Sequence, residues 1–274
     1  MPLAALAGDK TCTRELFEAH GLPVAAGRTF SREEIGQAAA FGVSLGGRCV
    51  VKPAIDTGAG VGVSIGLRTP REIRRAFLLA AAYSREILLE AEAPGDSYRF
   101  LVFRGRCLSV IRRETPSVTG NGSDSVRRLV LDLNSERIKG PGWRYGDPFF
   151  MPVPAGRNAS AVLDGQGLSW NSTPEPGRVV RLAAIANFRT GCTFSECIRA
   201  AHPAACETAI RATDALGLEL AGVDLMLRDI ASPSRHLLEI NTTPYLPMHY
   251  LIRNPDECVD PIRAILTGYF GLAD

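Results

Sequence analysis

Two apolar segments near the C-terminal end constrain the fold of this chain more than any other feature. They cover Leu220–Leu227 and His236–Asn241, and the short turn-rich stretch between them is typical of two paired strands. If the strands pair, Asp224 comes close to Glu239 and Asn241, which share one strand face because they are two residues apart. Carboxylate and amide oxygens are ligands that Mg²⁺ prefers. The sequence therefore predicts a magnesium site; the alternative is a set of polar residues on a solvent-exposed strand face.

The small number of lysines in this chain gives a second indication of a ligand-binding site. The chain contains 28 Arg but only three Lys, which are Lys10, Lys52 and Lys139. A lysine ammonium is a compact point charge that suits a phosphate in a narrow slot, whereas the guanidinium of arginine is a wide planar fork. Lys10 and Lys52 occur in motif-like settings, so we interpret them as candidate phosphate ligands. The alternative is that they are compositional remnants.

A glycine-rich turn follows the predicted strand that contains Lys52. The strand covers Cys49–Pro53, a partner strand is expected at 61–67, and the turn at 56–62 lies between them. Glycines let backbone amides approach phosphate oxygens without interference from a Cβ atom. The turn matches neither the P-loop nor the Rossmann fingerprint, and an ordinary flexible hairpin is the alternative. Its candidate phosphate-binding glycines are Gly58, Gly60 and Gly62.

The remaining pattern indicates helices and strands in mixed order, which favours an α+β or mixed α/β fold. The stretch 137–177, rich in Gly, Pro and aromatic residues, is either a linker or, as we prefer, a long functional loop. Helices are expected at 9–19, from Ser31 with Glu34 as its capping box, at 71–83 with Thr69 as cap, at 203–216 and at 255–270. Further strands are expected at 87–90, 98–103 and 107–111.

Composition excludes several classes of protein. No run of 18 apolar residues exists, so we expect no membrane span, and the net charge of +2 argues against nucleic acid as a partner. Seven Cys without a Cys-x-x-Cys pair favour reduced thiols in a cytoplasm.

Several short strings occur together in one order. They are Asp9-Lys10, Val51-Lys52-Pro53, the glycine-rich turn, Leu89-Glu90, and Asp224 followed by Glu239-Ile240-Asn241. In this order the sequence resembles the ATP-grasp ligases, and in particular the ligase domain of cyanophycin synthetase and of bifunctional glutathione synthetases. The similarity covers nearly the whole chain.

The resemblance implies an ATP-grasp fold of the α+β class, with two α/β lobes and ATP between them. A small lid lobe would cover about 21–93, and a large catalytic lobe about 1–20 and 94–274. The usual N-terminal domain of this family is expected to be missing.

The resemblance also implies roles for individual residues. Lys10 and Lys52 would hold the phosphates of ATP, and the glycine-rich turn would close over them. Either Arg112 or Arg113 would act beside Lys52 in catalysis, near the transferred phosphoryl group or the substrate carboxylate. The nucleotide would further contact Glu90, Ala93, Asp96 and Ser97, and one or two Mg²⁺ ions would bind Asp224, Glu239 and Asn241.

The implied activity is that of an ATP-dependent ligase joining a small carboxylic acid to an amine, such as an amino acid or peptide, through an acyl phosphate. The expected assembly is a homodimer or a complex with a separate substrate-binding protein. This chain departs from the family pattern at Ala183, Cys192, Tyr245 and Ser97. The alternative is therefore a degenerate or partner-dependent ATP-binding module with a regulatory or scaffolding role.

Overall fold

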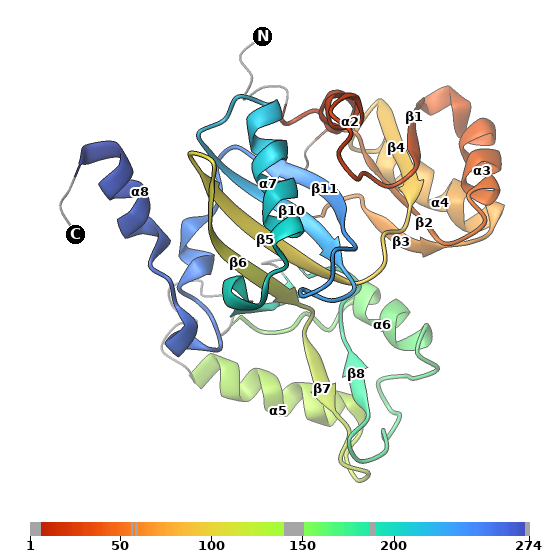
Figure 1. The fold of residues 1–274 in the computed structure, drawn as a ribbon. Helices are drawn as coiled ribbons and strands as arrows, with labels where there is room; N and C mark the ends of the chain where they lie inside the picture. The colour runs from red at the N-terminus through yellow and green to blue at the C-terminus, as the bar shows by residue number, and fades with distance from the viewer. Residues whose placement is uncertain (1–6, 56, 58–59, 140–150, 187–189, 272–274) are drawn as a thin grey trace. The chain divides into compact units, whose positions relative to one another are not determined.

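A computed structural model describes residues 7–55, 57, 60–139, 151–186 and 190–271 as a mixture of helices and mainly antiparallel sheets (Figure 1). The chain divides into two compact units. The first comprises Met1–Arg112, Cys197–Leu246 and Val259–Asp274, and the second comprises Arg113–Glu196 and Pro247–Cys258. Within the described part of the chain, no helix is long and apolar enough to cross a bilayer. The α+β class predicted from the sequence is confirmed.

One sheet of the first unit lies entirely within the residues that we assign to the small lobe. Its strand order is β1-β4-β2-β3, and every neighbouring pair is antiparallel. Two helices pack against it and bury a core that includes Phe30 and Phe77. The lobe boundaries themselves stay a prediction. The elements are β1 (Gly27–Ser31), α3 (Ile35–Ser44), β2 (Cys49–Pro53), β3 (Ser64–Leu67), α4 (Pro70–Ala81) and β4 (Glu86–Ala91).

Helix α4 shows how local sequence sets these elements. Thr69 caps its first turn in a capping box with Glu72, as predicted, and Pro70 occupies the first helical position. The buried positions recur at helical spacing and face the core. Ser31 and Glu34 also form the predicted capping box, but it closes a 3₁₀ turn, Arg32–Glu34, that precedes α3. The buried residues of α4 are Ile73, Ala76, Phe77 and Ala80.

The second sheet of the first unit contains the two apolar strands predicted near the C-terminal end. They pair with each other as predicted, and β10 also pairs antiparallel with β5. Helix α7 packs on β10 and β5, as Figure 1 shows, and buries a core centred on Phe100 and Val223. The elements are β5 (Asp96–Phe103), β6 (Arg106–Glu114), α7 (Pro203–Ala215), β10 (Leu220–Leu227) and β11 (His236–Asn241), in the order β11-β10-β5-β6.

The terminal helix is shorter than predicted. The expected helix at 255–270 is divided into a 3₁₀ turn, Pro255–Glu257, and α8 (Pro261–Phe270). Asp260 has a left-handed backbone and caps α8, with its Oδ1 atom accepting from the Arg263 amide at 3.3 Å. This conformation cannot continue a right-handed helix, which is why the two pieces are separate.

The second unit corrects our interpretation of 137–177 as a long loop. That stretch contains the end of one helix and the whole of another, so the loop interpretation is wrong for these residues, while 140–150 lie outside the described residues. Glycine and proline are frequent in this stretch, and they obscured the sequence pattern of its short helical segments. The elements are β7 (Ser117–Thr119), α5 (Val126–Lys139), α6 (Arg157–Asp164), β8 (Val179–Arg181) and β9 (Thr193–Glu196), with β7 paired to β8.

Candidate functional site

The predicted metal ligands lie together on the β10–β11 pair. Asp224 is directly opposite Glu239, and Gly222 is directly opposite Asn241. A β-bulge follows Asp224, so the register shifts immediately beyond the three residues. Among the described residues, no group of three or more His, Cys, Asp and Glu side chains could hold a metal ion. The predicted set has two carboxylates and one amide, so its metal role stays a prediction.

Asp224 is held by an arginine that the sequence reasoning did not single out. Its carboxylate is 1% exposed and accepts two hydrogen bonds from Arg99, one from Nε and one from Nη2 at 3.1 Å. Arg99 lies opposite Asp224 in the β5–β10 register. Burial lowers the pKa of Arg99, but the charges of Asp224 and Glu239 outweigh burial, and its net pKa is raised. An arginine in the otherwise apolar β5 was the signal that could have identified it.

Gly222 creates the space that Arg99 occupies. A Cβ atom at this position would lie 2.8 Å from Arg99 Nη1 and 3.1 Å from Pro244 Cβ. Real Cβ atoms are almost never this close to another side chain, so a larger residue would displace the guanidinium. This glycine of β10 is therefore part of the geometry that fixes Asp224.

Lys10 lies beside the same strand pair. Its Nζ atom is 3.7 Å from Glu239 Oε2. The helix α2 (Lys10–Ala19) begins here because Asp9 caps it, accepting from the amides of Thr11 and Cys12. The Lys10 amide also donates to the carbonyl of Ala54 at 2.8 Å, which ties the start of α2 to the segment just after β2. Backbone contacts thus bring Lys10 to the strand that carries Lys52.

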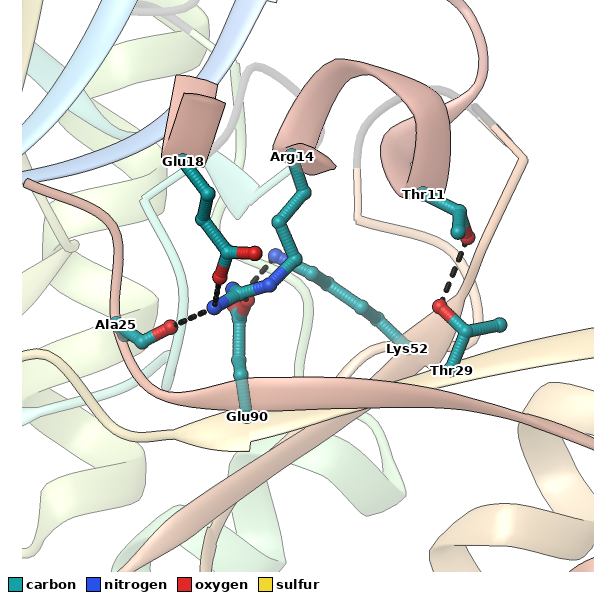
Figure 2. A network of polar contacts seen from close by, with 7 residues as sticks. All are labelled: Thr11, Arg14, Glu18, Ala25, Thr29, Lys52 and Glu90. Atoms are coloured by element: carbon teal, nitrogen blue, oxygen red, sulfur yellow. Dashed lines mark hydrogen bonds and ion pairs between the residues drawn. The ribbon is translucent and has the colours of Figure 1, made fainter. Parts of the chain in front are cut away.

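A buried charge cluster joins α2 to the small sheet, as Figure 2 shows. Lys52 Nζ lies 2.5 Å from Glu90 Oε1, and Arg14 Nη1 lies 3.5 Å from Glu90 Oε2. Arg14 also contacts Glu18 at 2.6 Å and donates to the carbonyl of Ala25. We predicted Lys52 and Glu90 as site residues but missed Arg14. It lies one helical turn after Lys10, on the same face of α2, and that spacing was the available signal.

A small cavity of about 20 Å³ lies between these groups. Its size corresponds to about one water molecule. The side chains around it supply the cations and the oxygen ligands that a metal–nucleotide complex needs, so the residues present fit the group chemically. In this conformation, however, the cations and carboxylates neutralise one another, so a nucleotide that bound here would have to replace those partners. The charged and polar residues that line the cavity include Lys10, Arg14, Glu90, Glu239 and Asn241.

The other predicted site residues do not line this cavity. Gly60 and Gly62 have positive φ angles of 71° and 78°, as a tight glycine turn requires, whereas Gly58 lies outside the described residues. Ala93 follows β4 and is half-buried, and Ser97 belongs to β5. Their nucleotide-binding roles stay predictions.

The two candidate catalytic arginines fall in different units. Arg112 belongs to the first unit, where its Nη2 donates to Asp96 Oδ2 at 2.8 Å. Arg113 belongs to the second unit, as does Cys192. Burial raises the pKa of the Cys192 thiol to about 11, and the charge of Arg113 opposes this rise. Burial therefore dominates the pKa of Cys192, despite the nearby positive charge of Arg113.

Comparison with known proteins agrees with these features. The chain is 30% identical over 249 residues to a cyanophycin synthetase from a Nostoc species, covering 89% of this chain and 27% of that protein. It is also 30% identical over 245 residues to the glutathione biosynthesis bifunctional protein GshAB of Listeria innocua, covering 88% and 31%. The chain thus spans about a third or less of the length of these curated relatives. No protein-family model matches it.

Solved structures share the fold. The bifunctional glutathione synthetase from Pasteurella multocida aligns over 98% of this chain and 37% of its own, with a TM-score of 0.64 and 24% identity. The ATP-grasp ligase PsnB, solved with a phosphomimetic precursor variant, Mg and ADP, aligns over 97% of this chain and 60% of its own, with a TM-score of 0.52 and 15% identity. The resemblance inferred from the sequence is therefore confirmed: this chain has the ATP-grasp fold and is related to the cyanophycin and bifunctional glutathione synthetases.

Proposed function

We propose that this chain binds Mg²⁺·ATP in its first unit and uses it to activate a carboxylate for amide-bond formation. The observation that carries the proposal is the β10–β11 register, which sets Asp224 opposite Glu239, with Lys10 at 3.7 Å from Glu239. Carboxylates and an ammonium in this arrangement suit a magnesium–phosphate complex. The names of the curated relatives support a biosynthetic joining reaction, because one is a cyanophycin synthetase and the other a glutathione biosynthesis protein.

Charge neutralisation and positioning would account for the catalysis. Lys10 and Lys52 would hold the phosphates, while Glu239, Asn241 and Asp224 would hold Mg²⁺. Bound Mg²⁺ would withdraw charge from the phosphate oxygens and favour departure of ADP. Both oxygens of Asp224 already accept hydrogen bonds from Arg99, so Mg²⁺ would share the Asp224 carboxylate with that guanidinium.

The proposed reaction has two balanced steps. A carboxylate oxygen of the acid attacks the γ-phosphorus, the bond to the β-phosphate oxygen breaks, and an acyl phosphate and ADP form. The amine nitrogen then attacks the acyl carbon, phosphate leaves, and one proton is released. Either Arg112 or Arg113 would stabilise charge on the transferred phosphoryl group or hold the substrate carboxylate. No covalent enzyme intermediate is needed.

The alternative is an ATP-binding module without ligase turnover. The departures at Ala183 and Tyr245 are the features that favour it. The ligase and the ATP-binding module would both bind Mg²⁺·ATP. Only ATP turnover in the presence of substrates therefore distinguishes the two functions.

The test measures binding and turnover on one preparation. Mg²⁺·ATP should raise the thermal midpoint, because a ligand that binds only the folded state stabilises it by mass action. ADP release is then followed with a pool of amino acids, and again with hydroxylamine, which traps an acyl phosphate as a hydroxamate. Stabilisation with ADP release supports the ligase. Stabilisation without ADP release favours the regulatory module, and no stabilisation at millimolar nucleotide contradicts both.

A further inference from the structure

A single buried carboxylate, that of Glu90, is shared by two cations of the first unit. Its Oε1 atom lies 2.5 Å from Lys52 Nζ, and its Oε2 atom lies 3.5 Å from Arg14 Nη1, as Figure 2 shows. All three side chains are at most 10% exposed. Each cation therefore contacts its own carboxylate oxygen, so one cation can leave while the contact with the other remains.

The two cations differ in how firmly they are held. Among the described residues, the Lys52 ammonium has Glu90 as its one hydrogen-bond and ion-pair partner. Arg14 has two further partners, because it contacts Glu18 Oε1 at 2.6 Å and donates to the backbone carbonyl of Ala25. A ligand that competes for one cation of this cluster should therefore displace Lys52 from Glu90 and leave Arg14 in place.

The start of β1 leaves room for the contact between Arg14 and Glu90. Gly27 lies directly opposite Glu90 in the β1–β4 register. A Cβ atom at Gly27 would lie 2.7 Å from Glu90 Cβ and 3.1 Å from Arg14 Nη1. Any larger residue would therefore push against both partners of this ion pair. Strand pairing and the glycine thus place the guanidinium beside Glu90 without the help of a ligand.

This arrangement has a consequence for a phosphate that binds Lys52. Such a phosphate takes away one of the two cations of Glu90. If Lys52 were the sole cation, the exchange would leave a buried carboxylate uncompensated and close to a second anion, and both effects are unfavourable. With Arg14 in place, Glu90 keeps a charge partner after Lys52 has turned to the phosphate.

We propose that Arg14 is a positioning residue of the nucleotide site, which retains Glu90 when Lys52 exchanges that carboxylate for a phosphate. The role rests on the proposed function, in which Lys52 is a phosphate ligand. Arg14 itself contacts neither the nucleotide nor the metal in this arrangement, and it acts only through Glu90. Its removal should therefore weaken the nucleotide because an unpaired carboxylate remains, and removal of that carboxylate should reverse the loss.

The experiment measures the dissociation constant of Mg²⁺·ATP by calorimetry in the parent, in Arg14→Met and in Arg14→Met combined with Glu90→Gln. We expect Arg14→Met to weaken binding at least about tenfold, the effect of losing about 1.4 kcal/mol. The double variant should bind more tightly than Arg14→Met alone, because the amide carries no charge that needs a partner. A double variant that binds no better than Arg14→Met would show that Arg14 contacts the phosphate itself or only supports the fold, and would overturn the proposal.

Two further variants keep the test independent of folding defects. Arg14→Lys retains a cation near Glu90 and should bind within about threefold of the parent, a difference of less than about 1.4 kcal/mol. Binding by Arg14→Lys as weak as that of Arg14→Met would contradict a role that depends on charge. Circular dichroism checks the fold of each variant, and Arg14→Gln, which keeps a donor for the Ala25 carbonyl, replaces Arg14→Met if the latter does not fold.

The matched control is Glu18→Gln. It removes the other carboxylate that contacts Arg14, whose side chain is 51% exposed, and leaves the contact with Glu90 intact. It should bind Mg²⁺·ATP as the parent does. A loss in Glu18→Gln equal to that in Arg14→Met would mean that Glu90 is not the residue through which Arg14 acts.

The parent protein separates this proposal from the proposed function. Binding of Mg²⁺·ATP by the parent with unchanged affinity in Arg14→Met would remove the role of Arg14 alone and leave the proposed function standing. No saturable binding by the parent at millimolar nucleotide would contradict the proposed function, and the role of Arg14 would fall with it.

Discussion

Lys10 Nζ lies 3.7 Å from Glu239 Oε2, so a cation that we assign to phosphate and a carboxylate that we assign to Mg²⁺ neutralise each other. The Glu239 side chain is 38% exposed, and an ion pair of this kind contributes about 0–1 kcal/mol. The pair between Lys52 and Glu90 is different, because both side chains are at most 10% exposed. A phosphate that displaced Glu239 from Lys10 would therefore do so at small cost, whereas the contact between Lys52 and Glu90 is more strongly held.

The first prediction concerns Glu239→Gln. Without ligand, the free energy of unfolding should change by less than about 1 kcal/mol, because the Lys10–Glu239 pair is partly exposed and its charged atoms are 3.7 Å apart. Turnover should fall about a hundredfold or more, since the charge that anchors Mg²⁺ is removed and each ~1.4 kcal/mol lost is tenfold. Steady-state ADP release and denaturant unfolding measure the two effects. The control is Glu219→Gln, which removes another exposed pair, 3.5 Å from Arg104, and should keep full turnover. Wild-type turnover in Glu239→Gln would refute the metal assignment.

The second prediction concerns Glu90→Gln. This change leaves Lys52 and Arg14 buried without the carboxylate that both contact. Removing one partner of a buried charge pair typically costs about 3–5 kcal/mol, so urea unfolding should show a loss approaching that size. Glu18→Gln is the matched control, because Glu18 contacts the same Arg14 but is 51% exposed, and it should cost less than about 1 kcal/mol. Equal effects of the two variants would show that burial does not govern this cluster.

The third prediction concerns Gly222→Ala. The added Cβ would lie 2.8 Å from Arg99 Nη1, so the guanidinium should be displaced from Asp224. We expect destabilisation of about 1–3 kcal/mol from overpacking, together with a loss of Mg²⁺-dependent activity. Gly36→Ala is the control: no atom lies within 4 Å of its added Cβ, and it lies in α3, where alanine should stabilise by up to about 1 kcal/mol. If Gly222→Ala behaves like Gly36→Ala, the space around Arg99 is not limiting.

The fourth prediction concerns alkaline pH. The folded protein holds the pKa of the Cys192 thiol at about 11, above its ordinary value of 9.0, because the thiol is buried. Its contribution to stability is therefore fully present below about pH 9 and is lost as pH rises toward 11. Cys192→Ala should make the fall in the free energy of unfolding over this window less steep, by up to about 1.4 kcal/mol per pH unit. Val180→Ala, which shortens a buried side chain that cannot titrate, is the control and should keep the wild-type slope. Parallel slopes for the parent and Cys192→Ala would contradict the assignment.

Some of this structure follows from local sequence. The bounds of β10 and β11 coincide with the predicted ones because their apolar runs are bordered by polar turns. Caps at Asp9 and Thr69 were also predictable, because short polar side chains before a helical pattern serve the unpaired amides of the first turn.

Other features depend on contacts between distant residues. Arg99 and Asp224 are 125 positions apart, and no local pattern relates them. Helix α5 was missed because its apolar positions are interrupted by charged residues, and its stability depends on packing with Leu163 and Val180. The cavity beside Lys10 has the same origin, since its walls come from segments that only the fold brings together.

The division of the chain into interleaved units has a consequence for its biosynthesis. The first unit is built from three separate stretches, and its central strands β5 and β10 are separated in sequence by most of the second unit. During translation, β5 leaves the ribosome long before its partner exists, and a loop of more than a hundred residues has to close before the pair forms. Such a topology has a high contact order and folds slowly. A nascent chain truncated before residue 220 should therefore expose an unpaired sheet edge and depend on chaperones for its solubility.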